Sequence, residues 1–169
     1  MALNIQKKKE IVTKIHYITK KSLSIVVINP TGIKSHDITR LRKIARKQNV
    51  KLGVFKNTLL HLGIQKTPFE YLKNIIVGPT LIAYSLTHPG SAAKLLKNFS
   101  ASQNNTHTNL KILGAGFEGK IILKQNINIL ADMPTFEEAI YRFIIFVKEI
   151  SVRKLLRTLI SIKNIKQNF

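Results

Sequence analysis

The stretch FKNTLL, residues 55–60, holds the residue types in this sequence that best suit binding of a phosphate. It places Lys56, Asn57 and Thr58 where an apolar run ends and a helical pattern begins. Free backbone N–H groups at a helix start, with a lysine and two small polar side chains, suit a phosphate oxygen or a ribose 2′-hydroxyl. The alternative is that Asn57 or Thr58 only caps the helix, and the spacing alone does not separate the two interpretations.

No other group of residues suits catalysis, a metal ion or a cofactor. The chain has no cysteine, and its five histidines are scattered without the spacing of metal ligands. GAGFEG, residues 114–119, comes nearest to a glycine-rich nucleotide motif, but it spans a strand end and a turn rather than a strand-to-helix junction. Glu137 and Glu138 are adjacent only within a predicted helix start. The sequence therefore predicts no enzyme, no metal site and no cofactor.

The net charge of +20 is concentrated near the N-terminus. Residues 1–66 hold 15 Lys/Arg and 2 Asp/Glu, a net +13, whereas 67–134 hold 6 and 3, and 135–169 hold 7 and 3. This favours a nucleic-acid partner, with a solubilising surface as the alternative. No aromatic-rich strand motif is present, which favours structured RNA recognised by shape and backbone. Besides Lys56, the cations expected at RNA phosphates are Lys7, Lys8, Lys9, Arg40, Arg42, Arg46 and Lys47.

Hydrophobic periodicity predicts helices alternating with four short strands over the first 134 residues. Three local signals refine it. Ser35 is predicted to cap a helix, Asn49 to end that helix in the left-handed conformation, and TPFE, residues 67–70, to start another through a capping box. A polar loop is expected at 101–109. The alternation predicts a compact α/β sandwich. Strands are expected at 23–28, 51–55, 80–84 and 110–117, and helices at 5–20, 36–48, 56–63, 89–99 and 124–130.

A long helix is predicted from Thr135 to Ile165, opened by the capping box TFEE. At about 1.5 Å per residue it would be roughly 46 Å long, whereas a domain of the preceding size is roughly 35–40 Å across. Its apolar stripe changes phase near Ser151, which predicts a kink or two docking segments in tandem. The residues expected to contact a partner are Ile140, Phe143, Ile144, Val147, Ile150, Val152, Leu155, Leu156, Leu159 and Ile162.

Three fates are open to this helix. It could fold back as a core helix, lie on a membrane surface as basic amphipathic helices do, or form a spine for partner proteins. Its length and its two tandem segments favour the spine. The N-terminus lacks a signal-peptide pattern, and no apolar run approaches a membrane span, so a cytoplasmic protein is expected. The organisation expected is an RNA-binding domain at 1–130, a hinge at 131–134 and a helical spine at 135–169.

Several longer motifs resemble one family, the L-ten proteins of the bacterial large ribosomal subunit, which form the stalk base. The resemblance runs from end to end, and the Val77–Leu95 run is its most specific part. The motifs are MALN, FKNTLL, TPFEYLK, VGPTLIAYSLTHPGSAAKL (77–95), AGFEGKII (115–122), LADMPTFEEAI (130–140) and KLLRTL (154–159).

The resemblance implies an α+β fold: a ferredoxin-like α/β sandwich with a mixed four- to five-stranded sheet, followed by a long C-terminal α-helix. The N-terminal domain would dock on large-subunit ribosomal RNA next to ribosomal protein L-eleven, with Gly32 in the turn that approaches the RNA. The helix would carry dimers of the acidic stalk protein L-seven/L-twelve, which recruit GTPase translation factors. Alternatives are a messenger-RNA-binding translational repressor and a membrane-surface protein.

Overall fold

The structure is a computed structural model that describes residues 4–102 and 110–167, apart from the side chains of residues 101, 102, 151, 152 and 167. The first three residues of MALN, and residues 103–109 of the expected polar loop, lie outside the described residues. The chain divides into two compact units, Met1–Met133 and Pro134–Phe169, and each is described by itself.

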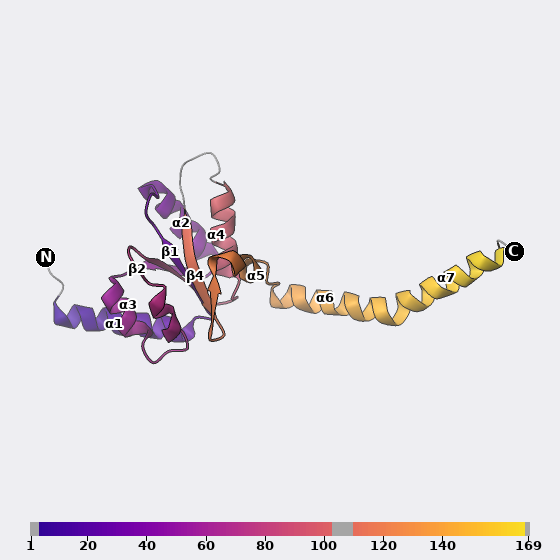
Figure 1. Ribbon diagram of the computed structural model, residues 1–169, viewed down its shortest axis with the longest axis horizontal. Helices are drawn as coiled ribbons and strands as arrows, with labels where there is room; N and C mark the ends of the chain where they lie inside the picture. Colours follow the sequence, from indigo (N-terminus) through magenta and orange to yellow (C-terminus); the bar gives the residue numbers. More distant parts are fainter. Residues whose placement is uncertain (1–3, 103–109, 168–169) are drawn as a thin grey trace. The chain divides into compact units, whose positions relative to one another are not determined.

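The first unit is built on a five-stranded sheet in the order β2-β3-β1-β4-β5, of which β1, β2 and β4 are labelled in Figure 1. Every pairing among the described strands is antiparallel, so the expectation of a mixed sheet is wrong. The order of β1 to β4, with helical crossovers, is that of the ferredoxin-like sandwich, which confirms the expected fold. The strands are β1 Ser24–Asn29, β2 Val50–Val54, β3 Leu81–Ser85, β4 Lys111–Phe117 and β5 Lys120–Leu123.

Helices cover both faces of this sheet because successive residues of β1 point to opposite sides. Val26 and Ile28 pack in one core with α2, α4 and α5, whereas Ile25 and Val27 pack in the other with α1, α3 and η1. All four β1 residues are fully buried, as the continuous apolar run predicts. The helices are α1 Ile5–Lys21, α2 Ser35–Lys47, α3 Asn57–Ile64, η1 Glu70–Asn74, α4 Ser91–Ser102, η2 Lys124–Asn126 and α5 Ile127–Ala131.

Two of the three local signals give a different structure from the one predicted. Asn49 does take the left-handed conformation, with φ of 54°. Ser35 is instead the first residue of α2, and the capping position belongs to Lys34. The TPFE motif starts only the short 3-10 helix η1, because the Thr67 hydroxyl donates to the Ile64 carbonyl at the end of α3 and does not cap.

The GAGFEG segment has a packing role. A Cβ on Gly116 would lie 2.9 Å from the Tyr71 Oη and 3.0 Å from the Leu72 Cδ1, and one on Gly114 would lie 3.2 Å from the Ile75 Cδ1. These glycines let η1 approach β4 closely. Gly119, with φ of 76°, then forms the tight turn into β5.

The second unit is helical and consists of α6 (Phe136–Lys148), a π turn η3 (Glu149–Arg153) and α7 (Lys154–Gln167). The predicted capping box at its start is confirmed. The Glu138 N–H donates to Thr135 Oγ1, and the Thr135 N–H donates to Glu138 Oε2, both at 3.3 Å. The predicted break near Ser151 falls within the π turn. Among the described residues, no helix is long and apolar enough to cross a membrane.

Candidate RNA-binding and partner-binding surfaces

The turn between β2 and α3 carries the three polar residues of FKNTLL. Lys56 occupies the N-cap position without a side-chain capping bond, so the capping alternative for Asn57 and Thr58 is wrong. Asn57 instead holds a neighbouring loop. Its Nδ2 donates to the Gly78 carbonyl at 2.8 Å, and its Oδ1 accepts from the Thr80 hydroxyl at 2.8 Å.

This bridge uses both ends of the Asn57 amide, so it leaves Lys56 and Thr58 to meet a ligand. Both side chains are exposed. They lie at the start of α3, where the first backbone N–H groups have no partner within the helix. The turn therefore keeps the geometry expected of a phosphate contact, with Asn57 as the residue that positions it.

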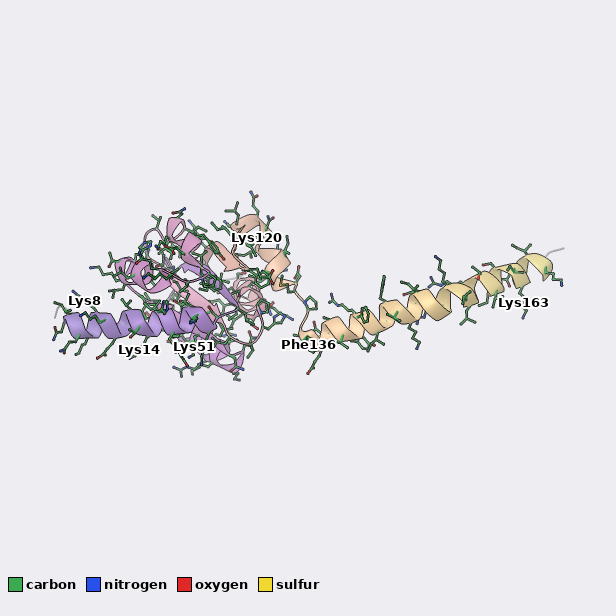
Figure 2. All side chains as sticks on the ribbon, turned by 90° about the horizontal axis from the view of Figure 1, so that it is seen from below. Lys8, Lys14, Lys51, Lys120, Phe136 and Lys163 are labelled. Carbon is green, nitrogen blue, oxygen red and sulfur yellow. The ribbon has the colours of Figure 1, made fainter. Side chains whose placement is uncertain are left out.

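The other basic residues predicted at RNA lie on two helices. Arg40, Arg42, Arg46 and Lys47 are exposed on α2, whose buried side is formed by Leu41 and Ala45. Lys7, Lys8 and Lys9 are exposed in the first turns of α1, where Lys8 is visible in Figure 2. Because α1 and α2 pack on opposite faces of the sheet, the structure does not gather these cations on one face.

The positive charge of this unit is largely uncompensated. The ion pairs among its described residues are His36–Asp37, Lys73–Glu70 and Lys97–Asp132, and none includes a cation predicted to contact RNA. Gly32 has φ of 87° in the turn after β1, and an added Cβ would meet no atom within 4 Å. Its turn is therefore open to the approach of a ligand backbone.

A pocket of about 630 Å³, which the sequence did not predict, lies along β2. β2 is an edge strand, paired only with β3. Arg42 and Arg46 of α2 line the pocket together with Lys51 and Phe55.

Lys51 lies beside the C-terminal half of α1 (Figure 2). There the charge of Lys51 and a hydrogen bond from Lys21 both affect the pKa of Tyr17. The hydrogen bond with Lys21 is the larger cause that lowers the pKa of the Tyr17 hydroxyl, and Lys51 adds to it.

The strongest pKa change among the described residues of the first unit is at Tyr84, and its main cause is burial. The Tyr84 side chain is 1% exposed, and this burial raises its pKa to about 12, with the Thr19 hydroxyl lowering it in part. Among the described residues, no three His, Cys, Asp or Glu side chains lie close enough together to hold a metal ion.

The helical unit buries none of the side chains that the structure describes in α6 and α7. Phe136, labelled in Figure 2, is 79% exposed, and Phe143 and Leu155 are each 65% exposed. No described residue of the unit covers this apolar surface, which is typical of a binding surface for a partner. Of the residues predicted to contact a partner, only the Val152 side chain lies outside the described residues.

The π turn determines how the two apolar segments face. An α-helix turns by about 100° per residue, so Ile140, Phe143 and Val147 share one face. Phe136 lies on that same face. In a continuous α-helix, Leu155 and Leu159 would be rotated roughly 100–140° around the helix axis from Phe136.

The π turn closes from the Lys154 N–H to the Glu149 carbonyl, and this ring holds one residue more than an α-helical ring. The extra residue turns α7 back by about 100°, which returns Leu155, Leu159 and Ile162 to the face of α6. Ile144 and Leu156 then flank that face on the same side. The two segments therefore form one continuous apolar face.

Comparisons with known proteins find matches along nearly the whole chain. A family model described as "Ribosomal protein L10" matches residues 3–101, which is more than half of the chain. A "Large ribosomal subunit protein uL10" of Buchnera aphidicola subsp. Baizongia pistaciae is 70% identical over 168 residues, covering 99% of each chain. Proteins of the same name from Wigglesworthia glossinidia brevipalpis and from Escherichia coli O1:K1 / APEC are 46% and 43% identical, each covering at least 97% of both chains.

These matches extend through both units, because the alignments include the helical unit as well as the sandwich. The matched family is structural and non-enzymatic, which agrees with the prediction that the chain is not an enzyme. The chain belongs to the ribosomal protein L10 family.

Proposed function

We propose that this structural, non-enzymatic protein of the large ribosomal subunit forms the base of the ribosomal stalk. The first unit binds large-subunit ribosomal RNA beside ribosomal protein L-eleven. The helical unit carries dimers of the acidic stalk protein L-seven/L-twelve, which recruit GTPase translation factors and support their GTP hydrolysis.

The observation that carries the scaffold role is the continuous apolar face of α6 and α7. A helix with large aliphatic and aromatic side chains exposed along one face is suited to packing against partner helices. The unit holds 7 Lys/Arg and 3 Asp/Glu over residues 135–169, a net +4, which favours an acidic partner.

The RNA-binding role is supported by the uncompensated cations of the first unit and by the turn at Lys56. It predicts that the affinity of the full chain for a large-subunit ribosomal RNA transcript falls steeply with salt. Lys56→Ala should reduce the log–log salt slope by about one, because one phosphate contact is lost. A slope unchanged from that of the wild-type chain would remove Lys56 from the interface.

The scaffold role is tested by placing polar residues on and off the apolar face. Leu155→Gln with Leu159→Gln should weaken binding of the acidic stalk dimer in calorimetric titration, because both side chains lie on the face. Ser161→Gln with Asn164→Gln, on the same helix but away from the face, is the matched control and should bind as the wild-type chain does. Equal binding by both double variants would mean that the face is not the contact surface.

A further inference from the structure

The pocket along β2 combines an apolar floor with a cationic rim. Ala45, Val50 and Leu52 are buried or half-buried in the floor, whereas Arg42, Arg46 and Lys51 are exposed around it. None of these three cations forms an ion pair with a described residue. A ligand with a flat apolar part and negative charge around it would therefore complement both the apolar floor and the cationic rim.

The size and the position of the pocket narrow the class of ligand. About 630 Å³ is within the range of roughly 300–1,000 Å³ that small-molecule sites show, so a nucleotide fits and a helix does not. Because β2 is an edge strand, alternate residues present backbone N–H and C=O groups to the open side. Such groups can hydrogen-bond the edge of a nucleobase.

One aromatic side chain, Phe55, lines the pocket, and a second, Tyr17, lies on α1 near the pocket residue Lys51. The Phe55 ring lies against the β2 backbone, since a Cβ added to Gly53 would be 2.3 Å from its Cε2. Tyr17 is exposed on α1, its ring 4.5 Å from the Lys21 ammonium, and it is within reach of the charge of Lys51. Unpaired bases stack on such rings, whereas paired bases in an RNA helix cannot.

We infer that this pocket holds one unpaired nucleotide of a structured RNA, with the base over the apolar floor against Phe55 and the phosphates at Arg42 and Arg46. The inference rests on the proposed RNA-binding function and names a nucleotide site within it. Basic residues around the pocket hold the flanking helical RNA, and the pocket selects an RNA in which a base can leave the stack.

The test compares two RNAs by fluorescence anisotropy with the full chain: a short fully paired duplex, and the same duplex with a single unpaired adenosine. The chain should bind the second RNA about 5- to 160-fold more tightly, the range for stacking one base. Arg42→Gln with Arg46→Gln should bring this ratio close to one. Lys43→Gln with Lys47→Gln, which removes the same charge from the same helix outside the pocket, should weaken both RNAs alike and keep the ratio.

A second variant tests the stacking surface without a change in charge. Phe55→Ala should lower the preference for the unpaired adenosine, and its melting temperature shows whether the domain is still folded. If this variant fails to fold, the arginine pair alone decides the question. Equal binding of the two RNAs by the wild-type chain would overturn the nucleotide site and leave the RNA-binding function intact. No salt-dependent binding of either RNA would instead overturn the RNA-binding part of the proposed function.

Discussion

The Asn57 bridge allows a quantitative prediction about the turn that presents Lys56. Asn57→Ala removes two hydrogen bonds of unequal value. The Gly78 carbonyl is exposed, so water replaces that bond at little cost. Thr80 is only 2% exposed, and leaving its hydroxyl without an acceptor should cost about 1–2 kcal/mol. We expect a total loss of about 1.5–2.5 kcal/mol, or roughly 5–10 °C in melting temperature by calorimetry of the full chain.

A double-mutant cycle isolates this bond. Thr80→Val replaces the hydroxyl with a methyl group of similar shape, so the buried group no longer needs an acceptor. In that background Asn57→Ala should cost about 1–2 kcal/mol less than it costs alone. Additive effects, or a loss below about 0.5 kcal/mol for Asn57→Ala, would show that the bridge does not hold the turn.

Two further predictions concern local packing and capping. Gly116→Ala places a Cβ about 2.9 Å from the Tyr71 Oη, so it should destabilise the sandwich by about 1–3 kcal/mol, measured by urea unfolding. An unchanged urea midpoint would contradict the close approach of η1 to β4. Thr135→Ala removes the acceptor of the Glu138 N–H and should weaken the first turn of α6 by about 0.5–2 kcal/mol, which should appear as faster amide hydrogen exchange in that turn. Thr135→Ser keeps the cap and is the control. Equal exchange in the two variants would argue against the capping box.

The elements that could be predicted are those whose own sequence carries the burial pattern. The continuous apolar run of β1 and the stripe of α2 are local signals, and so is the capping box at Thr135. β5 was not predicted as a strand, because it is only four residues long and its side chains are mostly exposed. The sequence signalled its turn at Gly119 but not the pairing that makes it a strand.

Features that depend on tertiary contacts could not be predicted. Asn57 bonds to residues 21 and 23 positions away, so its place at the start of α3 says nothing about its partners. The β2 pocket joins α1, α2 and two strands, which explains why its aromatic and basic residues look unrelated in the sequence. The phase change in the apolar stripe of the C-terminal helix indicated where the π turn lies. That the π turn joins the two apolar segments into one face could be inferred only from the backbone hydrogen bond between the Lys154 N–H and the Glu149 carbonyl.

The central claim is that one protein joins ribosomal RNA to stalk dimers through two separate units. Native mass spectrometry of the full chain, co-expressed with its acidic stalk partner, tests it most directly, beside a truncation that ends at Met133. We predict that the full chain carries whole dimers and that the truncation carries none, while both bind a large-subunit ribosomal RNA transcript. Dimers retained by the truncation, or absent from the full chain, would contradict the assignment of the helical unit as the scaffold.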